Sequence, residues 1–138
     1  MHRALPVLAV LSMFAAATAG VAAPAPEPAF AVLSGPFGQS FGYLTRVAVV
    51  PVGGQLLLAN ADVMLHDVVA MDAYGPDDQP WCGLFEEGRC PLFYSELARF
   101  GEVVPVHGTE QLQAGSTYTF YCTIHHSMIG TLVAVAEV

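Results

Sequence analysis

Short runs in which polar and apolar residues alternate predict a chain built mainly of β-strands. Successive side chains of a strand point to opposite faces, so alternation places one face in a core. Residues 117–121, Thr-Tyr-Thr-Phe-Tyr, show this pattern most cleanly. Further short apolar runs predict strands at 29–33, 41–45, 46–50, 55–59, 66–71 and 131–138.

Turn residues separate the predicted strands. Residues 51–54, Pro-Val-Gly-Gly, are typical of a turn between two of them. No segment carries a long helical period, and only residues 95–100 predict a single helical turn, with Ser95 as its cap. Many short strands joined by glycine and proline turns imply an all-β domain, an antiparallel sandwich or barrel. A chain of 138 residues is long enough for one such domain.

The segment at 72–104 departs from the strand pattern. It is rich in proline and glycine and holds two of the cysteines, so we expect a long loop inserted between strands. A disulfide between Cys82 and Cys90 would close a short ring and stabilise this loop by roughly 2 to 3 kcal/mol. The alternative is that the two thiolates bind a metal ion, although nothing else nearby has the spacing of a ligand.

The first 23 residues are predicted to be a secretory signal peptide. Arg3 precedes an apolar stretch at 4–17, which is short for a bilayer span, and small residues suited to cleavage follow it. Cleavage would leave residues 24–138 as a single domain with no membrane span, in the periplasm or outside the cell. The alternative is that the segment stays uncleaved as a membrane anchor.

The charge of the chain is strongly negative. Twelve Asp and Glu side chains stand against four Lys and Arg, for a net charge of -8. This excess repels nucleic acid and anionic lipid and argues against phosphate-backbone binding. It favours a protein partner with a cationic docking surface.

Three cysteines are an odd number for an exported protein, so a disulfide in the loop leaves Cys122 free. His125 follows it by three residues and Met128 by six, on one short loop between predicted strands. Thiolate, imidazole and thioether donors together suit copper. Two histidines, one cysteine and a distant methionine form the site of electron-transfer copper proteins. His66, which opens a predicted strand, is the best candidate for the second histidine.

These residues resemble the cupredoxins, the small blue copper proteins, and within them the plastocyanin and amicyanin type. The spacing of Cys122, His125, Met128 and Gly130 is similar to the short ligand loop of amicyanin. Residues 60–66 resemble the stretch that carries the first histidine ligand in that family.

The resemblance covers residues 29–138 apart from the segment at 72–104. It implies a Greek-key β-sandwich or barrel of the cupredoxin type that holds one type 1 copper ion. It also implies a monomeric carrier of single electrons rather than an enzyme, with a cytochrome or a copper enzyme as its redox partner.

The resemblance assigns roles to residues beside the ligands. In the family the residue after the first histidine, usually asparagine, bonds to the loop just after the cysteine, which here means Asp67 and Thr123. An aspartate adds negative charge near the metal and is expected to favour Cu(II). The imidazole of His125 is expected to be the exposed edge through which electrons pass, among apolar residues that include Met128.

Other functions remain open for the same donors. A copper carrier or storage protein would exchange its metal rapidly. A copper enzyme would need an open coordination position, which a full set of four ligands does not leave. Zinc fits one cysteine and two histidines, but a thioether as fourth donor argues for copper. A cysteine-protease pair is disfavoured because Cys122 and His125 share one tight loop.

Overall fold

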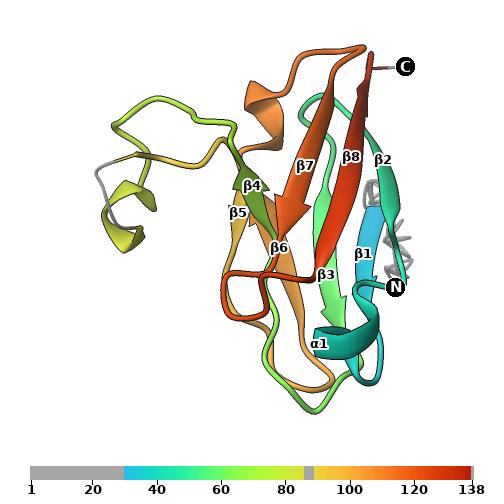
Figure 1. The fold of residues 1–138 in the computed structure, drawn as a ribbon. Coiled ribbons are helices and arrows are strands. Elements are labelled where there is room, and N and C mark those ends of the chain that lie inside the picture. Colours follow the sequence, from blue (N-terminus) through green and yellow to red (C-terminus); the bar gives the residue numbers. More distant parts are fainter. Residues whose placement is uncertain (1–29, 86–88, 138) are drawn as a thin grey trace, which may run out of the picture.

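Eight strands form one continuous sheet in the computed structural model, which describes residues 30–85 and 89–137. The strands are β1 (Phe30–Ser34), β2 (Val47–Pro51), β3 (Leu56–Asn60), β4 (Val69–Met71), β5 (Tyr94–Ser95), β6 (Val103–His107), β7 (Thr117–Tyr121) and β8 (Ile129–Val135). A short helix, α1 (Gly38–Phe41), and 3-10 turns at Cys82–Leu84 and Thr109–Gln111 lie between strands. The all-β prediction is confirmed (Figure 1).

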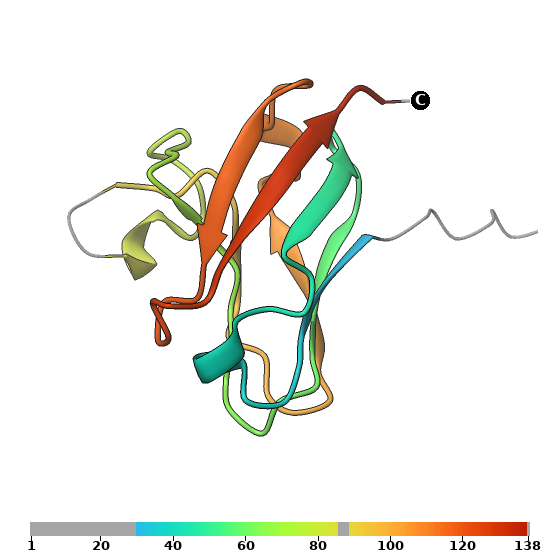
Figure 2. The same cartoon turned by 45° about the vertical axis from the view of Figure 1, so that its right-hand side comes forward.

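The strands follow the order β1-β3-β6-β5-β4-β7-β8-β2 across the sheet. The edge strands β1 and β2 come close to each other, which nearly closes the sheet into a barrel (Figure 1 and Figure 2). The pairs β1–β3 and β2–β8 are parallel, whereas the pairs between them are antiparallel. Alternation of side chains tells which face of a strand is buried but not the direction of its neighbour, so these parallel pairs were not predicted.

The predicted turn at 51–54 is present, but it does not join a hairpin. The Gly54 amide donates to the Pro51 carbonyl at 2.8 Å, and Gly53 has a positive φ of 73°, which glycine adopts readily. The flanking strands β2 and β3 nevertheless lie toward opposite ends of the sheet order. The chain therefore crosses the open edge of the barrel at this turn.

One cluster of buried apolar side chains fills the barrel. Tyr43, Phe93 and Phe120 are among the largest side chains that are fully buried. The rings of Tyr43 and Phe120 meet edge to face with their centroids 5.1 Å apart. Close packing of this kind holds the loops at the ends of the barrel in fixed positions.

Two predicted elements are wrong. Residues 41–45 form no strand, because Phe41 ends α1 and the next residue, Gly42, has a positive φ of 82° that turns the chain away from extended structure. Residues 95–100 form no helical turn, because Ser95 ends β5 and Ala98 makes a β-bridge to His66. The amide of Ala98 donates to the His66 carbonyl at 2.8 Å, and its carbonyl accepts from the His66 amide at 3.3 Å.

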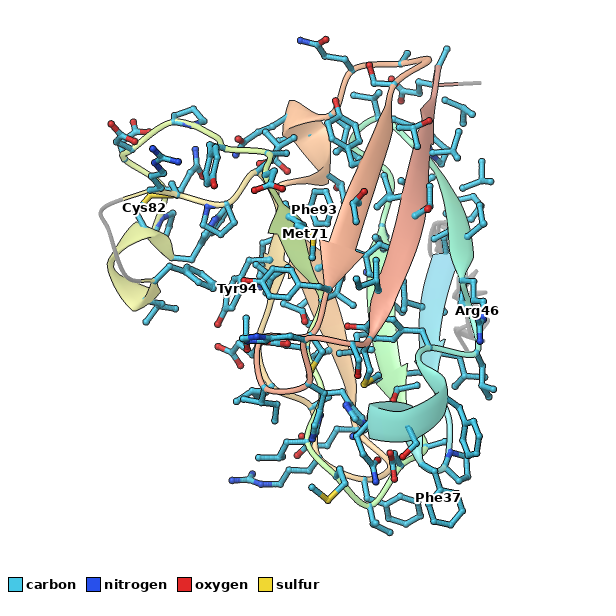
Figure 3. The ribbon with its side chains drawn as sticks, in the orientation of Figure 1. Phe37, Arg46, Met71, Cys82, Phe93 and Tyr94 are labelled. Atoms are coloured by element: carbon cyan, nitrogen blue, oxygen red, sulfur yellow. A yellow bond between two sulfur atoms is a disulfide. The ribbon has the colours of Figure 1, made fainter. Side chains whose placement is uncertain are left out.

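The segment at 72–104 contributes more to the barrel than a loop would. It contains β5 and the first residues of β6, and Phe93 within it is fully buried. The described residues before Phe93 form an arm beside the sheet, on which Figure 3 places Cys82. The predicted disulfide between Cys82 and Cys90 is confirmed, which excludes the alternative that both thiolates bind metal.

The predicted signal peptide, residues 1–23, lies outside the described residues. Within the part of the chain that the structure describes, no helix combines the length and the apolar character needed to cross a membrane. Export therefore stays a prediction.

Candidate metal centre

The loop between β7 and β8 carries three of the four predicted ligands. Cys122 follows the last residue of β7, and Met128 precedes the first residue of β8. The Cys122 amide donates to the Met128 carbonyl at 3.1 Å, and the Met128 amide donates to the His125 carbonyl at 2.8 Å. These bonds close the loop on itself, so the three side chains start from a rigid backbone.

His66 reaches the same place from a distant part of the chain. It was predicted to open a strand at 66–71, but β4 starts only at Val69, and His66 is held by its bridge to Ala98. Its Nδ1 atom lies 3.8 Å from Sγ of Cys122 and 3.2 Å from Nδ1 of His125. The thiol also lies 3.8 Å from Nδ1 of His125. Three predicted donors therefore converge on one point.

The converging side chains are largely shielded from solvent. His66 and Cys122 have an exposed fraction of 0%, whereas His125 is partly exposed. Cys122 is the free cysteine in the described part of the chain, as the pairing of the other two required. The three donor atoms lie within 4.8 Å of one another, which is the spacing of a single metal site.

Met128 is buried beside this cluster, against the first residue of α1. Its exposed fraction is 0%, so it lies beneath the surface rather than on it. A Cβ atom at Gly38 would lie 3.0 Å from Cε of Met128 and 3.1 Å from Nε2 of His66. A side chain at position 38 would therefore press on Met128 and His66, so the close approach of α1 to the site favours glycine there.

A carboxylate that the sequence analysis missed contacts His66. Oδ2 of Asp62 lies 2.9 Å from Nε2 of His66 and also accepts the Gly38 amide at 2.8 Å. Burial alone would raise the pKa of Asp62, but hydrogen bonds from His66 and from backbone amides outweigh it and lower this pKa to about 2. An ionised carboxylate only accepts, so Asp62 takes a hydrogen bond from Nε2–H of His66, and Nδ1 is the ring nitrogen that faces Cys122 and His125.

Asp67 connects the two chain segments that supply the donors. The Thr123 amide donates to Oδ1 of Asp67 at 2.7 Å, and the Thr123 hydroxyl donates to Oδ2. The buried hydroxyl of Tyr43 donates to the carbonyl of Asp67. Burial, with the nearby Cys122 and Asp67, raises the pKa of Tyr43, so this donor stays protonated. The bond between residues 67 and 123 is the one that the family resemblance led us to expect.

Burial sets the protonation of the donors in the metal-free protein. It raises the pKa of the Cys122 thiol, to which the charge of Asp67 also contributes. It lowers the pKa of His125, and the neighbouring His66 adds to this effect. At neutral pH the cluster therefore holds a thiol and a neutral His125 imidazole, a state that a soft cation can convert to a thiolate site.

The end of the barrel that holds the cluster has an apolar surface. Large apolar side chains are exposed on α1 and on the loops at this end, among them Phe37, Phe41, Leu97, Phe100 and Ile124. Figure 3 places Phe37 at the tip of this end, beside α1. His126 is exposed, and its Nε2 atom lies 2.6 Å from the Thr123 carbonyl. Of the three converging donors, only His125 reaches the surface.

No protein-family model matches the chain, and no curated protein matches it by sequence. Solved structures do match its fold. A purple cupredoxin from Nitrosopumilus maritimus shows 17% identity and a TM-score of 0.54, over 75% of this chain and 97% of that one. A reduced Cu(I) form of an amicyanin variant at pH 4 shows 20% identity and a TM-score of 0.53, over 80% and 86%.

An oxidised amicyanin variant is similar to the same degree. It shows 20% identity and a TM-score of 0.52, over 77% of this chain and 81% of that one. Identity at this level establishes a shared fold, and the predicted fold class is confirmed. What the site binds follows from its own donor atoms.

Proposed function

We propose that this chain, which has the cupredoxin fold, is an exported electron carrier that binds one type 1 copper ion. The ligands are His66, Cys122 and His125, with Met128 as a weaker fourth donor. The observation that carries the proposal is the convergence of one thiol and two imidazole nitrogens from segments 56 positions apart. No catalytic role is assigned, because four protein donors leave no position for a substrate.

The spacing of the donor atoms supports metal binding. Bonds of about 2.0 Å to nitrogen and about 2.3 Å to sulfur place N and S about 3.8 Å apart around an ion in their plane. Both nitrogens lie 3.8 Å from Sγ of Cys122. A buried thiol, two imidazoles and a thioether are the soft and borderline donors that copper prefers over zinc.

The bound copper would supply a one-electron Cu(I)/Cu(II) couple, and the described residues supply a rigid and shielded site. Hydrogen bonds orient His66, close the ligand loop and tie Asp67 to Thr123. Donors that are already in place need little movement when the charge of the ion changes, which favours fast electron exchange. The amicyanin structures are of reduced Cu(I) and oxidised forms, and this redox pair supports the same use here.

The partner is proposed to be another redox protein with a cationic docking surface. The net charge of -8 steers such a partner toward the chain, and the apolar end around His125 offers a short path for electrons. We further propose that residues 24–138 act as a monomer in the periplasm or outside the cell.

The burial of the ligands argues against a copper carrier or storage protein. Rapid metal transfer needs donors that an acceptor can reach, but His66, Cys122 and Met128 are fully buried. Rates of copper loss and of electron self-exchange decide between the two functions. Fast loss with slow self-exchange would favour a carrier. A spectral shift on adding azide would instead indicate an open copper position.

The direct test is to express residues 24–138, add Cu(II), and record the absorption spectrum and a redox titration. The wild type is expected to bind one ion with an intense blue or purple band from thiolate-to-copper charge transfer. Cys122→Ser and His125→Ala should lose this band. His126→Ala is the matched control and should keep it, because His126 is exposed beside the ligand. A Cys122→Ser protein that keeps the band would refute the proposal.

A further inference from the structure

We infer that Asp62 is a positioning residue that holds His66 in its metal-binding orientation and shifts the site toward Cu(II). The inference rests on the proposed copper site. It concerns a carboxylate four residues before the ligand, on the side of the imidazole that faces away from Cys122. The observation behind it is the contact of 2.9 Å between Oδ2 of Asp62 and Nε2 of His66.

The contact determines which nitrogen of the His66 ring is available to bind a metal ion. The carboxylate accepts a hydrogen bond from Nε2–H, so in the neutral ring Nδ1 is the unprotonated nitrogen, and Nδ1 is the atom that faces Cys122 and His125. Without an acceptor on that side, the neutral ring could place its proton on either nitrogen. Protonation at Nδ1 would block the ligand position.

Asp62 is itself held in place from two sides. Its amide donates to Oδ1 of Asn60 at 2.8 Å, and its Oδ2 accepts the Gly38 amide at 2.8 Å. The side chain of Asn60 in turn donates to the carbonyls of Met64, at 2.7 Å, and Ala98, at 2.8 Å. The end of β3, the start of α1 and the bridge at Ala98 thus converge on this carboxylate.

Burial makes the contact effective. Asp62 is 3% exposed and His66 is 0% exposed, so water competes little for either partner. In this setting a charge-assisted hydrogen bond is stronger than in solvent. The partners of the carboxylate are backbone amides and the imidazole itself, so its negative charge acts on the ring and on whatever the ring binds.

Two consequences for the metal follow. A carboxylate that accepts a hydrogen bond from Nε2–H raises the electron density at Nδ1 and makes Nδ1 a better metal donor. A fixed negative charge near the ion also stabilises a doubly charged ion more than a singly charged one. Both effects strengthen Cu(II) binding more than Cu(I) binding, so Asp62 lowers the reduction potential of the site.

The experiment compares Asp62→Asn and Asp62→Ala with the wild type. An asparagine oxygen can accept from His66 and Gly38 as Oδ2 does, so Asp62→Asn removes the charge and retains the shape. Asp62→Ala removes both the charge and the acceptor. Glu110→Gln makes the same change of charge on an exposed side chain in the 3-10 turn at the opposite end of the barrel, and serves as the control (Figure 1).

Affinities for Cu(II) and Cu(I) are measured by chelator competition. Asp62→Asn is expected to weaken Cu(II) binding by about 10- to 100-fold. Cu(I) binding should weaken less, so the ratio of the two affinities falls and the potential rises. Glu110→Gln should leave the ratio unchanged. A folded, blue Asp62→Asn protein with the wild-type ratio would overturn the inference.

A second measurement needs neither copper nor a variant. Nitrogen-15 NMR of the metal-free wild type should show His66 as the tautomer protonated at Nε2, with a slowly exchanging proton. Protonation at Nδ1 instead would overturn the inference. A wild type that binds no copper would refute the proposed function, whereas this measurement tests the positioning role by itself. The two failures are therefore distinguishable.

Discussion

Asp67 and Thr123 are joined by two hydrogen bonds, although 56 positions separate them in the sequence. The amide of Thr123 donates to Oδ1 at 2.7 Å, and its hydroxyl donates to Oδ2. The pair ties the residue after His66 to the residue after Cys122. Donors from two distant segments are thereby held in one arrangement before any metal binds.

Asp67→Asn is expected to raise the reduction potential without disturbing the fold. The amide oxygen can accept from the Thr123 amide, and the amide nitrogen can donate to the Thr123 hydroxyl. One negative charge near the ion is lost, so the ratio of Cu(II) to Cu(I) affinity should fall about tenfold. A redox titration measures this change. Thr123→Ala, which retains the charge, should move the potential less, and an unchanged or lower potential in Asp67→Asn would contradict the explanation.

Cu(II) binding is expected to release a proton from Cys122. Because burial raises the pKa of this thiol and lowers that of His125, the metal-free site at neutral pH holds one proton that Cu(II) must displace. About one proton per ion should leave, and the apparent affinity should rise about tenfold per pH unit below the pKa of the thiol.

An indicator dye in weak buffer measures the proton release, and chelator competition at several pH values measures the affinity. Cys122→Ser is the control and should release no such proton. An affinity that stays constant between about pH 6 and pH 8 would contradict the assignment of the thiol as the protonated group.

Gly130→Ala is expected to lower the free energy of unfolding by about 1 to 3 kcal/mol. Gly130 lies opposite Phe120 in the β7–β8 ladder, and a Cβ atom there would overlap the buried Phe120 ring. Urea denaturation measures the change. Gly83→Ala is the matched control, since a Cβ atom at Gly83 meets nothing within 4 Å. If both variants lost the same free energy of unfolding, the overlap with Phe120 would have no cost of its own, and the prediction would be wrong.

Replacing both disulfide cysteines by serine is expected to lower the free energy of unfolding by roughly 2 to 3 kcal/mol. The copper spectrum should stay unchanged, because Cys82 lies on the arm beside the sheet, away from the ligand loop (Figure 3). Denaturation and absorption are recorded on the same Cys82→Ser, Cys90→Ser double variant. Loss of the blue band would show that the arm supports the metal site.

The ligand loop was predictable because its information is local. Cys122, His125 and Met128 lie within a few positions of one another, and β7, which leads into them, has the predicted bounds Thr117–Tyr121. The prediction of His66 rested largely on the family resemblance of residues 60–66, since nothing in its own neighbourhood indicates that it approaches Cys122. Its exact setting, a bridge to Ala98 before β4 begins, was missed.

The sequence did not single out Asp62, because an aspartate in a short connecting segment is usually exposed to solvent. Its position four residues before a candidate ligand was the available signal. Only the fold shows that the carboxylate is buried and that Gly38 and His66 both donate to it. The same fold places Gly38, the first residue of α1, against Met128 and forms no strand at 41–45, where the apolar residues had predicted one.

By itself the sequence predicted the all-β class, a disulfide between Cys82 and Cys90, and the close spacing of Cys122, His125 and Met128 as candidate donors. These depend on side-chain alternation and on short spacings, which are properties of neighbouring residues. Only the tertiary structure decided that β1–β3 and β2–β8 run parallel, that His66 meets Cys122, and that Asp62 backs His66. Such contacts arise when distant segments pack around one core, and no local pattern specifies which segments will meet.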